Sequence, residues 1–498
     1  MSRESGMAKN ILIFSDGTGQ AGGLRPDQNL SNIYKLYRAS RTGPDSPIDP
    51  REQVAFYDAG LGTESDGGKI PFRPIQQFRK LWSSATGTGI TQNIIDCYEA
   101  IIRLYEPGDR VFLFGFSRGA YTARCVGGVM SLCGIPTHIA DGRPIPKLGK
   151  RLRKIATEAV RDTYQHGSGR NDQDRKDERD EKGRRFREKY GSNNTDGQAN
   201  EVPYFIGVFD TVAALGAPAL RRLGLGLLLA VFTATLVAGA AFFLALTPWL
   251  TFWPTFAVLA LVTTAAFLVP SLQAQFRFIR HFPEQGDFKW HFVSWRFRFY
   301  DNQLNKRVRF ARHALAIDEH REDFDRVPWA SKGAWESRIN EPEWLKQVWF
   351  AGNHSDIGGS YPEDEARLSD ISLSWMLQEV TSLPSPLQVD SSKLNLFPDA
   401  RGPQHCELES MRDAYPAWCP PKLRFVWASK ARPILPEAPL HPSVFERFEV
   451  SPGILRYGSL EPYRPVNLQL HHNVTAFYPK EDPPTALTRA HVDRKIEI

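Results

Sequence analysis

Residues 111–124 read VFLFGFSRGAYTAR, an apolar run that changes abruptly into small and polar residues. Gly115, Ser117 and Gly119 fit the pattern G-x-S-x-G, with a strand-like run before them and a helix-like segment after them. In a tight strand-to-helix turn of this kind, small residues on both sides of the serine let strand and helix pack closely, and the turn exposes the hydroxyl at the edge of the sheet. The stretch predicts that Ser117 is a catalytic nucleophile, with a purely structural turn as the alternative.

Short β-like runs recur along the chain, and helical patterns lie between several of them. Residues 91–105, TQNIIDCYEAIIRLY, place apolar side chains at helical spacing directly before the strand-like run at 110–114. Further strand-like runs lie at 10–14, 53–57, 204–209, 289–293 and 347–350. Strands that alternate with helices favour a mostly parallel sheet with helices on both faces. With the serine motif, this pattern predicts an α/β fold of the α/β-hydrolase type.

Composition narrows the possible functions. The chain has 498 residues and a formal net charge of +6, with basic and acidic residues interspersed. Without a basic stripe, this charge gives no support to nucleic-acid binding. The five cysteines are odd in number and form no CxxC pair, so they indicate neither a structural zinc site nor a disulfide framework. The apolar run at residues 11–14 is too short for a signal peptide, and we expect the chain to begin in the cytosol.

A long segment in the middle of the chain carries no ionisable side chain. Residues 223–276 contain no Asp, Glu, Lys, Arg or His, and Pro248 and Pro254 divide them into two halves of about the twenty residues that a bilayer crossing needs. Arginines flank the segment on both sides, which places both ends in the cytoplasm by the positive-inside rule. We therefore predict an inserted transmembrane helical hairpin. A hairpin that dips into one leaflet and an apolar lid folded onto the enzyme are the alternatives.

These features divide the sequence into four parts. The first part of the hydrolase domain is expected at residues 1–222, with a charged insertion at about 168–199. The hairpin at 223–276 separates it from the second part at 277–383, and a proline-rich, irregular cap region follows at 384–498. Because two crossings return the chain to the same side of the membrane, residues before and after the hairpin can build one site.

A serine nucleophile needs a histidine as base and usually a carboxylate to orient that histidine. In parallel α/β sheets the working residues lie at the carboxyl ends of the strands. Asp210 follows the run PYFIGVF, and His354 follows VWFAGN. The order Ser117, Asp210, His354 is also the order found in α/β-hydrolases, so we predict that these three residues form a catalytic triad. Asp356 is the alternative acid, although its place two residues after His354 suits it better to stabilising that loop.

The negative charge that develops on a reacting ester carbonyl needs two backbone N–H donors. The backbone of Arg118, directly after the serine, is expected to supply one of them. The glycine-containing loop after the first strand is the candidate for the other, through Gly17 or Thr18. Asp16 in that loop is a secondary candidate, either as a metal ligand or in a turn. A single aspartate without a cluster of partners favours the turn, and the sequence predicts no metal site.

Beyond the serine motif, ten sequence blocks in a fixed order resemble the type VI secretion phospholipase effectors of the first lipase-effector family, which have an α/β-hydrolase catalytic domain formerly of unknown function. The blocks are FSDGTG, LSNIYKL, YDAGLGT, GDRVFLFGFSRGAYTARCVGG, GVFDTVAALG, RHALAIDE, VWFAGNHSDIGGSYPE, ISLSWMLQE, LHPSVFERF and YRPVNL. The family's Ser, Asp and His triad falls on Ser117, Asp210 and His354. The resemblance implies hydrolysis of the acyl esters of phospholipids.

The resulting hypothesis is a membrane-anchored serine hydrolase that cleaves lipid esters through an acyl-enzyme, as a phospholipase does, without a metal or organic cofactor. Membrane lipid would be both its substrate and its anchor. The expected location is the bacterial inner membrane, with both termini and the catalytic domain in the cytoplasm. Two alternatives stay open: a serine hydrolase for a non-lipid ester or thioester, and a membrane-disrupting effector or scaffold whose hydrolase domain is a sensor. An oligomer or a partner protein is compatible with each.

Overall fold

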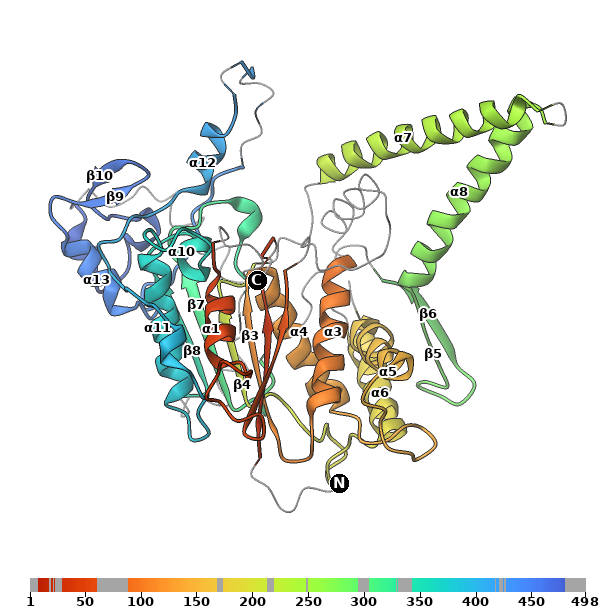
Figure 1. Ribbon diagram of the computed structural model, residues 1–498, viewed down its shortest axis with the longest axis horizontal. Helices are drawn as coiled ribbons and strands as arrows, with labels where there is room; N and C mark the ends of the chain where they lie inside the picture. The colour runs from red at the N-terminus through yellow and green to blue at the C-terminus, as the bar shows by residue number, and fades with distance from the viewer. Residues whose placement is uncertain are drawn as a thin grey trace.

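The structure is a computed structural model (Figure 1). It describes residues 8–17, 19–20, 22, 29–60, 88–167, 173–212, 219–247, 250–293, 304–327, 329, 343–416, 418–420, 424 and 427–479.

A six-stranded sheet forms the centre of the molecule. Its strands run in the order β2-β1-β3-β4-β7-β8, and all five pairings between them are parallel. They are β1 (Asn10–Ser15), β2 (Gln53–Asp58), β3 (Arg110–Phe116), β4 (Phe205–Phe209), β7 (Phe310–Ala316) and β8 (Leu345–Phe350). All residues of β1 and β4 are buried, as expected for parallel strands that are covered on both faces. The predicted α/β fold with a mostly parallel sheet is confirmed.

Helices cover both faces of this sheet, and the alternation of side chains along a strand divides the core in two. Ile11 and Ile13 of β1 pack in one cluster with α3 (Thr88–Leu104) and α4 (Arg118–Cys133). Leu12 and Phe14 point to the other face, in a second cluster with α1 (Asn32–Ser40) and α11 (Arg367–Thr381). Each face therefore has its own apolar layer, and the polar ends of the strands remain at the sheet edge.

The predicted charged insertion contains regular structure. It packs on the face of the sheet that α4 covers (Figure 1). Its helix α6 (Gln173–Tyr190) contacts α4 and buries Phe186 and Tyr190 in the first core cluster. Three shorter elements precede it: α5 (Lys150–Thr157), the π-helix η1 (Glu158–Thr163) and the 3-10 helix η2 (Tyr164–Gly167). The strongly charged sequence thus forms one helix with a buried face.

Two long helices occupy the position of the predicted hairpin. They are α7 (Ala219–Ala245) and α8 (Phe252–Gln275), which contact one another and project from the body of the molecule (Figure 1). Crossing a bilayer requires about twenty consecutive apolar residues in a helix. Among the residues described, no helix combines the length and the apolar character for a membrane crossing. The predicted pair of helices is present, but the predicted crossing is not supported.

The chain leaves α8 directly into a two-stranded antiparallel ribbon, which stands apart from the main sheet (Figure 1). Its strands are β5 (Phe276–Arg280) and β6 (Phe288–Phe292). The strand-like run at 289–293 therefore belongs to this ribbon and not to the central sheet. Exposure alternates along both strands, so one face of the ribbon is apolar and open while the other faces the protein.

The C-terminal region packs around the carboxyl ends of β7 and β8. A third apolar cluster joins Leu315 and Trp349 of the sheet, and Ile317 just after β7, to Val444 and Phe448 from this region. Its regular elements are short: η4 (Ser391–Lys393), α12 (Glu407–Asp413), α13 (Pro442–Glu449), β9 (Ile454–Arg456), β10 (Ser459–Glu461), η6 (Val466–Leu468) and η7 (Thr475–Phe477). This region therefore covers the end of the sheet at which the candidate site lies.

Candidate active site

Ser117 lies in a sharp turn between β3 and α4. Its backbone has φ 58° and ψ −120°, a conformation that costs energy for a residue with a side chain. The glycines around it are required by close contacts. A Cβ atom at Gly119 would lie 2.0 Å from the carbonyl oxygen of Ser15, and one at Gly115 would lie 2.6 Å from the Cα of Ala120. The G-x-S-x-G pattern thus has the steric cause that the sequence suggested, and Ser117 is held where strand, turn and helix meet.

Asp210 lies beside Ser117 because their strands are neighbours in the sheet. Phe116 of β3 pairs with Phe209 of β4, and the residue after each of them is a predicted site residue. The backbone N–H of Ser117 donates to the carbonyl of Phe209 at 3.2 Å. Asp210 also has a positive φ, 38°, and is completely buried. The sheet register therefore places the serine and the aspartate at the same edge.

His354 comes to the same edge from β8 by way of a short helix, α10 (His354–Gly358). Its Nδ1 lies 2.5 Å from Oδ2 of Asp210. Since an ionised carboxylate only accepts, Nδ1 donates this hydrogen bond and the lone pair is on Nε2. Nε2 is buried and forms no hydrogen bond within the described part of the chain, including none with Ser117. The imidazole is thus oriented with its basic nitrogen uncommitted.

Two aromatic rings hold the His354 imidazole. The ring of Phe116, the residue before Ser117, lies with its centroid 4.7 Å from that of the imidazole. The ring of Phe324, from the 3-10 helix η3 (Glu322–Phe324), packs edge-on at 5.3 Å. Because Phe116 directly precedes Ser117, this contact places His354 next to the serine turn. The structure therefore brings Ser117, Asp210 and His354 together; their catalytic roles remain a prediction.

Arg432 completes the surroundings of Asp210. Its Nη1 donates to Oδ1 at 2.6 Å and its Nη2 donates to Oδ2 at 3.0 Å, and the backbone N–H of Ala316 adds a third bond at 3.0 Å. Burial by itself would raise the pKa of the Asp210 carboxyl, but the charge of Arg432 and the hydrogen bond from His354 outweigh it and hold the pKa well below its usual range. Asp210 therefore stays ionised beside His354.

Sequence reasoning did not find Arg432, although it forms two hydrogen bonds with the predicted site residue Asp210. It lies 222 positions after Asp210 in the irregular C-terminal region. No local motif marks it, because a buried arginine in a loop looks like any surface arginine in the sequence. Arg432 can be recognised as a site residue only in the tertiary structure, where the C-terminal region packs on the sheet.

The predicted oxyanion donors have different surroundings. Arg118 is the first residue of α4, so its backbone N–H has no intrahelical acceptor. Gly17 lies in the loop beside the serine, since a Cβ atom on it would lie 3.5 Å from the Cβ of Ser117. However, the N–H of Gly17 donates to Oδ1 of Asp16 at 2.7 Å. Thr18 lies outside the described residues. The oxyanion role of these residues therefore stays a prediction, with Arg118 in the best position.

Asp16 anchors the loop after β1. Its carboxylate accepts hydrogen bonds from the hydroxyls of Ser31 at 2.5 Å and Tyr57 at 2.6 Å, besides the one from Gly17. Burial raises its pKa to about 6, although these hydrogen bonds lower it in part. Among the residues described, Asp16 belongs to no group of three potential metal ligands. Its contacts agree with the turn-stabilising role that was favoured from the sequence.

Asp356 shapes the loop that carries His354. With Asn353 it forms a capping box at the start of α10, in which the Asn353 side chain accepts from the N–H groups of Ser355 and Asp356, both at 2.9 Å. The Asp356 carboxylate accepts from the N–H of Asn353 and from Nδ1 of His405 at 2.7 Å. The acid bonded to His354 is Asp210. Asp356 thus has the loop-stabilising role expected for it.

The chain is similar to parts of several known proteins. A protein of Saccharomyces cerevisiae, described as uncharacterized, is 32% identical over 137 residues, which are 27% of this chain and 19% of that protein. A crystal structure of an uncharacterized protein from Pseudomonas aeruginosa is 18% identical with a TM-score of 0.35, covering 78% of this chain and 48% of the other. The structure of the Tle1 effector bound to the VgrG spike of the type VI secretion system is 17% identical with a TM-score of 0.27. The match covers 73% of this chain and 53% of the other.

This chain spans about a fifth of the yeast protein and about half of each of the two solved chains. The broader match is to a family. Residues 9–379, which include Ser117, Asp210 and His354, match the family described as "T6SS, Phospholipase effector Tle1-like, catalytic domain". The chain therefore belongs to the Tle1-like family of type VI secretion phospholipase effectors and carries its catalytic domain.

Proposed function

We propose that this protein is an α/β-hydrolase that cleaves the carboxylic esters of phospholipids with a Ser117, His354 and Asp210 triad. The observation that carries the proposal is the 2.5 Å hydrogen bond between His354 Nδ1 and Asp210 at the sheet edge where Ser117 sits in its strained turn. Family membership makes a phospholipid the leading substrate. A hydroxyl, an imidazole and an ionised carboxylate in this arrangement are the groups that acyl transfer requires.

In the proposed reaction, Oγ of Ser117 attacks the ester carbonyl carbon while Nε2 of His354 takes the hydroxyl proton. Asp210 accepts the hydrogen bond from Nδ1 and stabilises the imidazolium that forms. The backbone N–H of Arg118 and a second N–H from the loop after β1 hold the oxyanion. His354 then returns the proton to the leaving alcohol, which departs as the lysophospholipid and leaves an acyl ester on Ser117. Water, deprotonated by His354, attacks this ester and releases the fatty acid.

Membrane contact through α7, α8 and the β5–β6 ribbon is the second part of the proposal. Large apolar side chains lie exposed along both helices, among them Phe243, Trp253 and Leu261. The open face of the ribbon adds five exposed aromatic side chains in mutual contact: Phe276, Phe278, Phe288, Trp290 and Phe292. The Arg280 guanidinium lies over two of these rings, those of Phe278 and Phe288.

Exposed apolar area of this extent, with aromatic rings and a cation at its border, is typical of surfaces that lie in the lipid interface. Contact with lipid through this surface would bring the enzyme to the ester carbonyls at the level of the head groups. We therefore place the active protein on one face of a membrane, with the helical pair and the ribbon in contact with lipid.

The test of the chemistry is the release of fatty acid from labelled phospholipid vesicles. Wild type should release it, and Ser117→Ala and His354→Ala should lose about three orders of magnitude or more of that rate. A fluorophosphonate probe should label wild type but not Ser117→Ala. Thermal unfolding of each variant checks that the fold is retained.

Two results would contradict the proposal. Equal release of fatty acid by wild type and Ser117→Ala would exclude the triad as the source of the activity. Labelling of Ser117 by the probe without any release from phospholipid would favour the alternative of a non-lipid ester or thioester as substrate.

A further inference from the structure

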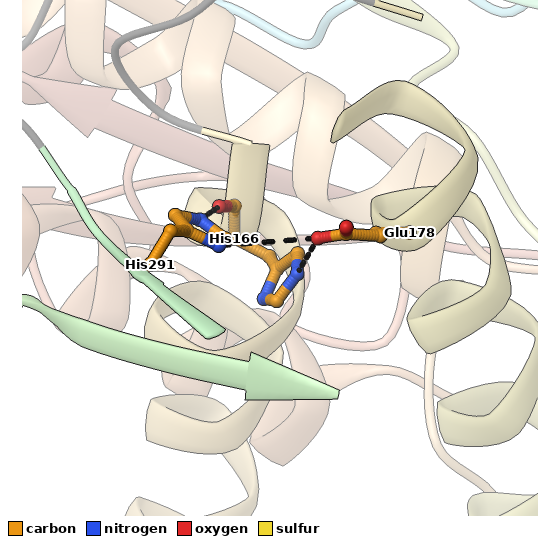
Figure 2. Close-up of side chains that lie close together, drawn as sticks. All are labelled: His166, Glu178 and His291. Atoms are coloured by element: carbon orange, nitrogen blue, oxygen red, sulfur yellow. Dashed lines mark hydrogen bonds and ion pairs between the residues drawn. The ribbon is translucent and has the colours of Figure 1, made fainter. Parts of the chain in front are cut away.

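A second cluster of reactive side chains lies away from the candidate triad, where the charged insertion meets the ribbon. His166 comes from η2, Glu178 from α6 and His291 from β6 (Figure 2). Each side chain offers one ligand atom, and the three atoms lie within 4.8 Å of one another. His166 and Glu178 are buried, and the His291 side chain is nearly so. Three segments that are distant in the sequence thus converge on one point below the surface.

One ring nitrogen of each histidine faces the Glu178 carboxylate at this point. Nε2 of His291 lies 2.7 Å from the backbone carbonyl of His166, which can only accept, so Nδ1 of His291 carries the lone pair. A histidine that donates its other ring N–H to a backbone carbonyl is the usual arrangement around a bound metal ion. Oε2 of Glu178 lies 3.9 Å from this Nδ1 and 2.9 Å from Nε2 of His166 (Figure 2).

His166 uses one of its ring nitrogens within the cluster, where Nε2 contacts Oε2 of Glu178. Its Nδ1 is buried without a hydrogen-bond partner in the described part of the chain. Without an ion Nε2 donates to the Glu178 carboxylate, so an ion bound at Nε2 would move the ring proton to Nδ1.

The types of ligand in the cluster indicate which ion would fit. Nη1 of Arg175 contacts both Nδ1 of His291 and Oε2 of Glu178, the latter at 3.3 Å, so these two acceptors already converge on a cation. Glu178 supplies the one negative ligand, and the positive charges of Lys182 and Arg277 nearby oppose any cation, so an ion would have to be held by the ligands themselves. Calcium and magnesium prefer sites made of several oxygen ligands. Two imidazoles and one carboxylate are instead a typical ligand set for zinc.

We propose that His166, Glu178 and His291 bind a divalent transition-metal ion, zinc foremost, which displaces the guanidinium of Arg175. The ion would join the inner face of the β5–β6 ribbon to η2 and α6. Since the outer face of the same ribbon carries the exposed aromatic cluster and its first strand continues from α8, the ion would fasten the apolar projection to the catalytic body. The alternative is a purely hydrogen-bonded cluster that holds no ion.

Zinc binding by the full-length chain tests this proposal. The protein is prepared without a histidine tag, treated with a chelator and titrated with zinc chloride alone. We expect one tightly bound zinc ion per chain and a rise in Tm of about 2 °C or more, because the ion binds only the folded state. His291→Ala and Glu178→Gln should weaken binding by about tenfold or more. Arg175→Ala should strengthen it, because the competing guanidinium is removed.

His472→Ala is the matched control, because His472 is exposed and lies outside the cluster. It should bind zinc as wild type does. Wild type that takes up no stoichiometric zinc would overturn the proposal, and so would zinc binding that His291→Ala and Glu178→Gln leave unchanged. Glu178→Gln keeps the size of the side chain, so circular dichroism should show that it folds. If Glu178→Gln does not fold, Arg175→Ala provides the test instead. Zinc binding by Arg175→Ala that is no tighter than in wild type would contradict the proposed site.

Discussion

At the scale of single residues, the candidate site depends on keeping one buried carboxylate charged. Asp210 is completely buried, and burial alone would favour its neutral form. Arg432 reverses this preference with two hydrogen bonds and a full positive charge. A protonated Asp210 could not stabilise the imidazolium that forms during proton transfer. Arg432 is thus a positioning residue that acts through Asp210.

Arg432→Gln should therefore change the pH dependence of the reaction. Without the guanidinium, burial dominates, the pKa of Asp210 rises, and the carboxyl takes up a proton as the pH falls through the weakly acidic range. We expect the acid limb of kcat/KM to move to higher pH by about one unit or more. The stability that the ionised carboxylate contributes in wild type is present above its unfolded pKa and is lost only as the pH falls through its depressed folded pKa. The variant should lose that contribution at a higher pH.

Arg447→Gln is the control for this measurement. Arg447 is another buried arginine of the C-terminal region, but it donates to the carbonyls of Ala400 and Gly402. It should lower stability without moving the acid limb. An acid limb that is the same in Arg432→Gln and wild type would show that Arg432 does not control the charge of Asp210.

At the scale of elements, the site is built from the ends of neighbouring strands, whereas the apolar projection is built from elements outside the sheet. The turn after β3, the end of β4 and the helix after β8 carry Ser117, Asp210 and His354. The helices α7 and α8 and the β5–β6 ribbon lie between β4 and β7 in the chain but add no strand to the main sheet. Such an insertion leaves the sheet register unchanged, so its surface can be altered without disturbing the triad.

The triple substitution of Phe243, Trp253 and Leu261 by serine tests the proposed lipid contact. All three side chains are more than two-thirds exposed, so the fold should not depend on them. Burying such a side chain in lipid contributes on the order of 1.5–3 kcal/mol. We expect binding to phospholipid vesicles to fall by at least about tenfold, and hydrolysis of vesicle lipid to fall with it. Hydrolysis of a soluble short-chain ester should stay unchanged.

The control is the serine substitution of Leu435, Val466 and Leu470, which are exposed apolar residues of the C-terminal region. It should leave vesicle binding as in wild type. Vesicle binding that survives the substitutions on α7 and α8 would refute the contact on these helices.

At the scale of the whole molecule, the C-terminal region is part of the candidate site. It supplies Arg432 to Asp210, and its apolar side chains pack on the ends of β7 and β8 in the third core cluster. Phe448 lies near the middle of this packing, with ring centroids 5.2 Å from those of both Tyr463 and Phe477. The stability of the cluster and the position of Arg432 should therefore be linked.

Phe448→Ala should lower the free energy of unfolding by about 3–5 kcal/mol, because it removes a buried ring and leaves a cavity. Urea denaturation measures this change, and the activity of the remaining folded protein should fall as the region that carries Arg432 loosens. Phe397→Ala is the control, since Phe397 is 61% exposed and should change stability little. An equal effect of the two substitutions would mean that the third cluster does not hold the region in place.

Local sequence patterns were enough to predict the parallel sheet, the turn at Ser117 and the two helices at 223–276. Apolar periodicity and the spacing of glycines report steric requirements between near neighbours, which any short segment carries in itself. They did not establish whether those two helices cross a membrane, because an apolar pair of helices can also lie in one leaflet or fold onto the protein. The aromatic face of the ribbon was missed because its two strands are short and separated by a loop.

The sequence by itself determined which elements form and which residues end the parallel strands, because both follow from backbone sterics and the burial of apolar side chains. Only the tertiary structure decided that Arg432 keeps Asp210 charged, that His405 binds Asp356, and that His166, Glu178 and His291 meet beneath the ribbon. These contacts join residues as far as 222 positions apart. Such pairs depend on how whole layers pack, and a polar side chain that becomes buried by packing has no signature in its neighbours along the chain.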